Sequence, residues 1–349
     1  MMNLDIKSLY LEELTEELKG HGEPAYRAKQ VFQWLHNKLA LSYDHMTNLP
    51  KALREKLQDI YPLISLKEVT SLHSKTDETV KYLFRLQDDR VIESVLMKYH
   101  HGNSVCISSQ VGCKMGCKFC ASTIGGKERD LLPSEMLDQV YRIQSLSGER
   151  VSNVVVMGTG EPFDNYDNLI RFLRLLTDPM GLNISARNLT VSTCGIPDRI
   201  REFAKEGMPI TLALSLHAPN DEIRSQLMPV ARQYNIDDVL DACNYYYEMT
   251  GRRITFEYSM VAGINDDENH AKELASRIKG MNCHVNLIPV NPIKEREFRQ
   301  SDSRNIQEFK KILEKYRINV TIRREMGADI DAACGQLRKS YVDNLAYRS

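Results

Sequence analysis

Four of the eight cysteines of this chain lie within the short stretch CISSQVGCKMGCKFC, residues 106–120. Three of them, Cys113, Cys117 and Cys120, follow a C-x3-C-x2-C pattern, and Cys106 stands seven residues before the first. Three thiolates can hold a 4Fe–4S cluster and leave its fourth iron open to a small molecule. The spacing therefore predicts a cluster that binds and reduces a ligand. A zinc ion bound by all four cysteines is the alternative.

Polar residues follow several apolar runs further along the chain, where predicted strands end. The run VVVMGTGEP leads into Gly160 and Glu161. A glycine lets the backbone approach a ligand, and a carboxylate can meet an ammonium group. Because the ends of parallel strands share one face of an α/β fold, the series predicts a small-molecule site there. Each residue alone could instead cap a helix or form a turn. The later members of the series are Ser192, Ser215, Leu216, His217 and Asn291.

One acidic residue falls on an apolar strand face. Residues 79–87 and 90–99 are strand-like and flank Asp88-Asp89, which predicts a hairpin. Glu93 shares strand parity with Val95 and Met97, so its carboxylate would lie among apolar side chains. An edge strand would tolerate such a residue, and a nearby reaction site would use it.

Length and composition set the broad class. The chain has 349 residues, 42% of them hydrophobic, which is enough for two domains or for a barrel with an appendage. The net charge of −1 gives no overall sign of a nucleic-acid partner. Neither a secretory leader nor an apolar stretch of about 20 residues is present, so we expect a cytoplasmic protein without a membrane span. Thiols stay reduced there, so clustered cysteines are ligands or catalysts.

From residue 103 onward, strand-like runs alternate with helical runs. This alternation predicts βαβ units with a parallel sheet, and six or seven units favour a partial or full α/β barrel. We therefore expect a helical domain over residues 1–60, a hairpin linker over 61–102 and a barrel core over 103–349. The run YRAKQVFQWLHNKLA predicts a helix with one apolar face, formed by Ala28, Val31, Phe32, Leu35 and Leu39.

A local excess of positive charge lies near the N-terminus. Residues 21–56 contain six Lys or Arg against three Asp or Glu. Such a stretch is either an ordinary solvated surface or an RNA-facing one. The second interpretation assigns RNA contacts to Lys29, Lys38, Lys51 and Arg54.

Together with GTGEP, STCGI, LSLHAP, HVNLIPVNP and DIDAACGQL, the cysteine stretch resembles the dual-specificity 23S rRNA/tRNA adenine methyltransferases (RlmN family) of the radical SAM superfamily. The resemblance implies a partial (β/α)6-type barrel, with an N-terminal helical accessory domain and a β-hairpin linker. It implies one 4Fe–4S cluster on Cys113, Cys117 and Cys120, with S-adenosylmethionine held by the strand-end residues and used twice per turnover. It also implies 23S rRNA and tRNA as substrates, a reductant such as flavodoxin or ferredoxin, and a monomer.

The resemblance further implies roles for two more cysteines. Carbon 2 of adenine is electron-poor and cannot attack a sulfonium methyl group, so Cys334 would carry the methyl group and join the RNA covalently. Cys106 would release the product by forming a disulfide with Cys334. The proton of carbon 2 would pass to Glu93, with Cys106 as the competing acceptor. The other three cysteines, Cys194, Cys243 and Cys283, are expected to be small buried residues.

Three alternatives stay open at this point. A sister group that methylates carbon 8 of the rRNA adenine shares the cluster and both catalytic cysteines. A zinc-dependent RNA-binding module would need no GTGEP stretch. A radical enzyme acting on a small metabolite would leave the basic N-terminal region without a task.

Overall fold

The computed structural model describes residues 5–332 and 336, apart from residues 64, 101 and 294–295. Its centre is a ten-stranded sheet in the order β1-β2-β3-β4-β7-β8-β9-β10-β11-β12. Pairing is antiparallel from β1 to β4 and parallel from β4 to β12. The strands of this sheet are β1 (Lys67–His73), β2 (Val80–Arg85), β3 (Val91–Tyr99), β4 (Gly102–Ile107), β7 (Val151–Val156), β8 (Leu189–Thr193), β9 (Thr211–Ser215), β10 (Ile254–Met260), β11 (Cys283–Pro289) and β12 (Asn319–Ile322).

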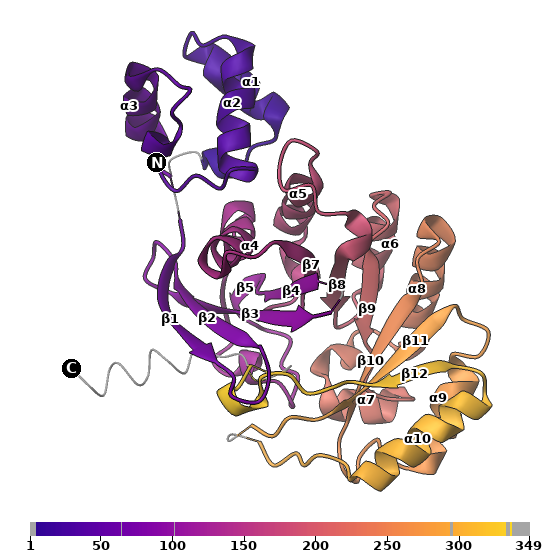
Figure 1. Ribbon diagram of the computed structural model, residues 1–349. Helices are drawn as coiled ribbons and strands as arrows, with labels where there is room; N and C mark the ends of the chain where they lie inside the picture. Colours follow the sequence, from indigo (N-terminus) through magenta and orange to yellow (C-terminus); the bar gives the residue numbers. More distant parts are fainter. Residues whose placement is uncertain (1–4, 64, 101, 294–295, 333–335, 337–349) are drawn as a thin grey trace.

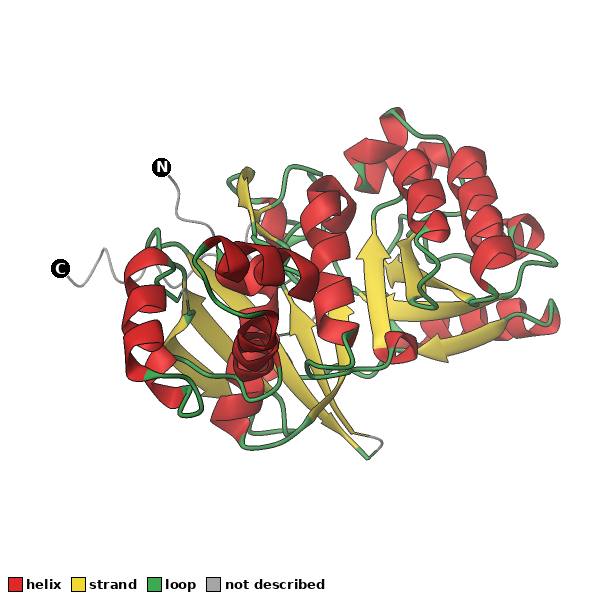
Figure 2. Cartoon of the chain, turned by 90° about the horizontal axis from the view of Figure 1, so that it is seen from above, coloured by secondary structure: helices red, strands yellow, loops and turns green. Residues whose placement is uncertain are grey.

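The parallel strands curve around a shared interior, and helices cover their outer side (Figures 1 and 2). Apolar runs such as TLALS in β9 are buried, as expected for strands covered on both faces. β1 and β12 are the two edges of the described sheet, so the barrel is open. The covering helices are α4 (Pro133–Ser147), α5 (Tyr166–Thr177), α6 (Pro197–Lys205), α7 (Asp221–Leu227), α8 (Ile236–Thr250), α9 (Glu268–Arg277) and α10 (Ser303–Lys315).

The barrel expected from the sequence is confirmed, and its parallel part has seven strands in the described residues, within the six or seven units expected. The predicted hairpin is also present, with Leu83 of β2 opposite Glu93 of β3. β1 adds a third antiparallel strand to it. A separate two-stranded sheet, formed by β5 (Gln110–Gly112) and β6 (Lys127–Asp130), flanks the cysteine loop. Within the described residues, no helix is long and apolar enough to cross a bilayer.

Three helices precede the sheet: α1 (Leu11–Gly20), α2 (Ala25–His36) and α3 (Lys51–Ile60). The buried face of α2 contains four of the five residues predicted for it, with His36 in addition. The prediction was wrong at Leu39, because the helix ends at His36 and Leu39 has a positive φ of 55°. The division of the chain near residues 60 and 102 stays a prediction.

Buried polar contacts join the region of these helices, including the short 3-10 helix Ile6–Ser8 before α1, to α4. The Lys7 ammonium lies 2.8 Å from the Asp138 carboxylate, and both side chains are almost fully buried. His36 Nδ1 lies 2.9 Å from the Tyr141 hydroxyl oxygen. Burial lowers the pKa of His36 to about 3, so its imidazole is neutral. Such contacts fix the helices in one orientation, since a slight shift would leave buried polar groups unpaired.

Candidate active site

The loop between β5 and β6 carries Cys113, Cys117 and Cys120. Its shape depends on Gly112, whose φ is +73° and where a Cβ atom would come within 2.0 Å of the Gly126 carbonyl oxygen. The Thr123 hydroxyl donates to the carbonyl oxygens of Cys117 and Cys120, at 3.1 and 2.9 Å. The close approach at Gly112 and the hydrogen bonds of Thr123 thus shape the loop that carries the three cysteines.

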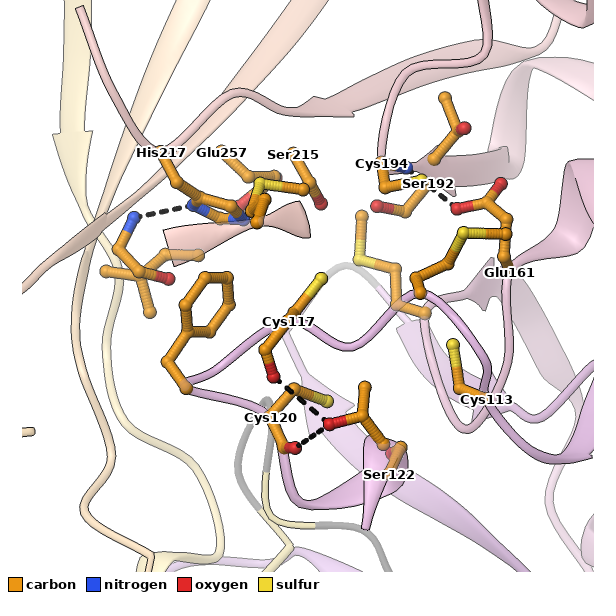
Figure 3. Close-up of a pocket in the computed structure, with 18 of the residues that line it drawn as sticks. Cys113, Cys117, Cys120, Ser122, Glu161, Ser192, Cys194, Ser215, His217 and Glu257 are labelled. Atoms are coloured by element: carbon orange, nitrogen blue, oxygen red, sulfur yellow. Dashed lines mark hydrogen bonds between the residues drawn. The ribbon is translucent and has the colours of Figure 1, made fainter. Parts of the chain in front are cut away.

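The three cysteine side chains surround a common space (Figure 3). Burial raises the pKa of the Cys113 thiol to about 12 and that of Cys117 well above its usual value. These thiols therefore ionise when a metal replaces their protons. No group of three or more His, Cys, Asp or Glu side chains in the described part is already close enough to hold a single metal ion. The fit to an iron–sulfur cluster rests on the three-thiol donor set and on the space that the thiols share.

A cavity that is open to solvent lies next to the cysteine loop. It collects the ends of several parallel strands, as the sequence predicts. Of the predicted cofactor residues, Leu216 does not line it; its side chain is in the main core and its backbone N–H donates to the Glu257 carbonyl oxygen. The predicted residues that do line the cavity are Gly160, Glu161, Ser192, Ser215, His217 and Asn291.

Glu161 combines a capping role with a place in the cavity wall. Its carboxylate accepts hydrogen bonds from the backbone N–H groups of Phe163 and Cys194, at 3.0 and 2.8 Å. Burial raises the pKa of this carboxyl, and those hydrogen bonds act in the opposite direction. Gly160 precedes it with a φ of +111°, and a Cβ there would lie 2.6 Å from the Cβ of Gln110. The glycine is therefore required for β7 to turn closely past β5.

His217 is held as a neutral imidazole of defined tautomer. The backbone N–H of Ser259 donates to its Nδ1 at 2.9 Å, so its ring proton is on Nε2. Burial lowers the pKa of His217 to about 3. Its φ is +57°, and the ring of Phe119 from the cysteine loop meets it edge-on, with centroids 4.7 Å apart. The histidine thus connects the end of β9 to the cysteine loop.

Glu257 lines the same cavity and was missed by the sequence analysis. It is buried in β10, where it accepts a hydrogen bond from Asn286 at 2.8 Å and lies 3.8 Å from the Arg323 guanidinium. Burial raises the pKa of this carboxyl. The sequence did contain a signal, because an acid within the apolar strand ITFEYSM is as unexpected as Glu93 within β3. Cys194, Cys243 and Cys283 are all buried, as predicted, and Cys194 also lines the cavity.

Cys106 lies in β4 and lines a second, adjoining cavity of about 700 Å³. The two cavities share Cys120, Ser122 and Asn291 among their lining residues. Cys106 is buried in an apolar cluster with Val95, Met97 and Ala332. Cys106 does not line the first cavity, so it lies apart from the cavity that Cys113 and Cys117 line.

Glu93 is buried in β3, two residues before Val95. It lines a third hollow, of about 580 Å³, which also contains Ser122. Its carboxylate lies 3.7 Å from the ammonium group of Lys81, whose side chain is equally buried. The structure therefore confirms an acid on this strand face and adds a basic partner that the sequence did not suggest. Cys334 lies outside the described residues; Ala332, the last described residue before it, lines the cavity of Cys106.

The four basic residues expected to contact RNA lie on or near α2 and α3. Lys29, Lys38 and Lys51 are exposed. The Lys38 ammonium lies 3.9 Å from the ring centroid of Trp34. Lys51 is 3.6 Å from Glu55, and Arg54 is 3.7 Å from Asp44. Acids on the same surface thus offset part of the charge expected from the sequence.

Comparisons with known proteins agree with this architecture. Residues 107–275 match the Radical SAM superfamily, and residues 4–62 match the ribosomal RNA large subunit methyltransferase N-terminal domain. A radical SAM methyltransferase from Sphaerobacter thermophilus, known from its crystal structure, is 44% identical with a TM-score of 0.93. That comparison covers 96% of this chain and 99% of the other.

Curated relatives are similar over almost their full length. A probable dual-specificity RNA methyltransferase RlmN of Lachnoclostridium phytofermentans is 65% identical over 340 residues, which are 97% of this chain and 96% of the relative. A protein of the same description from Lachnospira eligens is 62% identical over 341 residues, or 98% and 97% of the two chains. Membership of the radical SAM superfamily implies that a protein binds a 4Fe–4S cluster and S-adenosylmethionine. This finding speaks against the alternative of a zinc-dependent RNA-binding module. The chain belongs to the dual-specificity RNA methyltransferase RlmN family of the radical SAM superfamily.

Proposed function

We propose that the protein makes 2-methyladenosine at adenosine 2503 of 23S rRNA and at adenosine 37 of certain tRNAs. The observation that carries the proposal is the pair of adjoining cavities. One holds the three-thiol loop and the polar strand ends, and the other holds Cys106 beside the segment that leads to Cys334. This arrangement supports a reaction in which a cofactor site and a separate thiol pair act on one substrate.

The first cavity would hold both cofactors. Cys113, Cys117 and Cys120 would ligate the cluster, and Glu161 would meet the ammonium group of S-adenosylmethionine. When bound, the cluster supplies the electron that cleaves S-adenosylmethionine into a species able to abstract a hydrogen atom. The strand-end residues would orient S-adenosylmethionine. Each turnover would use two molecules of it, one to methylate Cys334 and one to be cleaved reductively. The strand-end residues are Gly160, Ser192, Ser215, His217 and Asn291.

The two remaining thiols would act in succession. Cys334 would accept a methyl group on its sulfur, lose a hydrogen atom from that methyl group and bond through the resulting carbon radical to carbon 2 of adenine. Loss of the carbon-2 proton and return of one electron to the redox centre of the cofactor site would leave a closed-shell adduct. The thiolate of Cys106 would then attack the sulfur of Cys334, so that a disulfide would form while the sulfur–carbon bond breaks. The bonding electron pair would stay with the methylene carbon, and protonation of that carbon would complete the methyl group of the released base.

Glu93 would accept the proton that leaves carbon 2, with Cys106 as the competing acceptor. Lys81 lies next to Glu93, so its ammonium group can stabilise the carboxylate form that a proton acceptor requires. We further propose a flavodoxin- or ferredoxin-type reductant, a monomeric state and a cytoplasmic location, where the RNA substrates are found.

The test is mass spectrometry of nucleosides from 23S rRNA and tRNA of cells with and without the gene. We expect 2-methyladenosine to disappear on deletion and to return with the wild-type gene. The Cys334→Ala gene should not restore it. Appearance of 8-methyladenosine would assign the carbon-8 reaction instead, and unchanged nucleosides would overturn the proposal.

A further inference from the structure

The turn between β1 and β2 contacts a segment that lies far away in the sequence. We call residues 74–79 the hairpin turn and residues 327–332 the C-terminal segment. Hydrogen bonds join the two across sequence separations of 250 residues or more. Neither stretch contains a residue assigned to the cofactor site, so cofactor binding does not explain these contacts.

The first contact is made by Asp329 of the C-terminal segment. Its carboxylate accepts hydrogen bonds from the Ser74 hydroxyl and from the Lys75 backbone N–H, both at 2.8 Å. The Ser74 hydroxyl oxygen in turn accepts the backbone N–H groups of Thr76 and Asp77, both at 3.1 Å. Ser74 therefore does two things: it holds Asp329 of the C-terminal segment, and it fixes the backbone of the hairpin turn.

In the second contact the accepting aspartate belongs to the hairpin turn and the donor to the C-terminal segment. Asp77 of the hairpin turn accepts the backbone N–H of Thr79 at 2.8 Å and that of Gly327 at 3.0 Å. Gly327 has a φ of +63°, and a Cβ there would lie 2.7 Å from Thr79 Cγ2 and 2.9 Å from Ala332 Cβ. Asp329 thus binds the hairpin turn and Asp77 binds the C-terminal segment, and Gly327 permits the close approach of the two.

Lys81, just past the turn, makes the third contact. Its buried ammonium group donates to the Asp331 carbonyl oxygen at 3.1 Å and lies 3.7 Å from the Glu93 carboxylate. Asp331 has a positive φ of 51°, so the chain bends sharply at this point. Immediately afterwards, Ala332 packs in the apolar cluster with Cys106.

We propose that the hairpin turn is a clasp that holds the C-terminal segment at the cavity of Cys106 and thereby favours the reaction of Cys106 with Cys334. Asp329 and Asp77 are its positioning residues, and Lys81 connects the clasp to Glu93. The inference rests on the proposed function, because it takes these two cysteines as carrier and resolving thiols. Its physical basis is effective concentration: anchoring the chain shortly before one thiol confines that thiol near the other.

The test measures the Cys106–Cys334 disulfide directly, in holoprotein equilibrated anaerobically with mixtures of reduced and oxidised glutathione. Peptide mass spectrometry gives the oxidised fraction and hence the effective concentration of the thiol pair. We expect Asp329→Ala and Asp77→Ala to lower this effective concentration about tenfold or more. Glu78→Ala is the matched control, since it removes an exposed carboxylate from the same turn and should leave the value unchanged.

A second readout separates positioning from general damage. Iron content and reductive cleavage of S-adenosylmethionine should stay at the wild-type level in Asp329→Ala, while methyl groups delivered to RNA per cofactor cleaved should fall about tenfold. Asp329→Asn, which keeps one carboxylate-like oxygen, should show a smaller loss. If Asp329→Ala fails to retain iron, Ser74→Ala removes a single donor to Asp329 and should lower the effective concentration several-fold.

The clasp would be overturned if both aspartate variants had the same effective concentration as Glu78→Ala. Where Ser74→Ala is used instead of the aspartate variants, the same result in Ser74→Ala would overturn it. A wild-type protein that methylates no RNA, but whose disulfide equilibrium still depends on Asp329, would refute the proposed function while the clasp remained.

Discussion

Cys113, Cys117 and Cys120 should be individually indispensable for the cluster. The pKa of both Cys113 and Cys117 is raised by burial, so each thiol stays protonated unless a metal takes the place of its proton. Replacing any one with Ala should reduce iron from about four per chain to near zero in anaerobically prepared protein. Iron analysis and the visible absorption spectrum measure this.

The control for that experiment is Cys243→Ala, which removes a core cysteine away from the cavity and should leave the iron content unchanged. Stoichiometric zinc without iron in the wild-type protein would contradict the cluster assignment.

Cys106 and Cys334 should give opposite results in a covalent-trapping experiment. Cys334→Ala removes the carrier, so neither methylated RNA nor a protein–RNA bond should form. Cys106→Ala leaves the carrier intact and removes the resolving thiol, so the enzyme should remain attached to its RNA. A slowly migrating band that survives denaturation and disappears on nuclease digestion is the expected sign.

The double variant should behave like Cys334→Ala, because a later step cannot matter when the earlier one fails. Repeated turnover by Cys106→Ala would show that another group releases the product.

The chemistry of single residues was predictable where it depends on local spacing. The C-x3-C-x2-C loop and the polar strand ends needed only neighbours in sequence and the rule that parallel strands end on one face. Lys81 beside Glu93 was not predictable, because it depends on the register of β2 against β3. Glu257 could have been noticed as a buried acid, yet its place in the cavity depends on the curvature of the sheet.

The contact of α2 with α4 should make stability depend on pH. His36 is neutral when folded, with a pKa lowered from 6.5 to about 3, whereas the unfolded chain takes up a proton below 6.5. Between pH 6.5 and about pH 3 the unfolded state therefore binds more protons than the folded state. The free energy of unfolding falls as the pH falls through this range. The loss approaches about 1.4 kcal/mol per pH unit.

Urea unfolding of wild type and His36→Asn, compared between pH 7.5 and pH 5, measures this dependence. The variant should be less stable at pH 7.5, because the contact with Tyr141 is weakened. Its stability should nevertheless fall less steeply on acidification. Parallel slopes for the two proteins would show that His36 does not remain neutral.

The strands and helices of the barrel were predictable because each apolar run has the period of its element. The end of α2 was not, since Leu39 continues the helical spacing of apolar residues although the chain has turned away at His36. The contact between the hairpin turn and the C-terminal segment has no local signal, because its two sides are 250 residues or more apart in the sequence.

RNA binding should depend on the N-terminal helices if their basic residues face the substrate. Lys51 and Arg54 lie near Glu55 and Asp44, so we expect Lys29 and Lys38 to contribute more than the other two. The quadruple alanine variant should bind RNA more weakly and with a flatter salt dependence, the slope falling by up to about 0.7 for each lost phosphate contact. Cofactor cleavage without RNA should not change.

Titration of binding against salt concentration measures this effect. A double variant of Lys311 and Lys315 to Ala, on α10, is the control for loss of exposed positive charge elsewhere. Affinity and slope equal to those of this control would assign the basic residues to an ordinary solvated surface.

The long sequence separation within the clasp bears on the order in which the protein matures. The hairpin turn is synthesised before the C-terminal segment, which follows it by 250 residues or more. At roughly 5–20 residues per second, tens of seconds separate the two. Most barrel strands and the cysteine loop can fold during this interval, but the clasp can close only once the C-terminal segment has been synthesised. A nascent polypeptide that ends before this segment can therefore fold much of the barrel, yet it still lacks the contacts of the clasp.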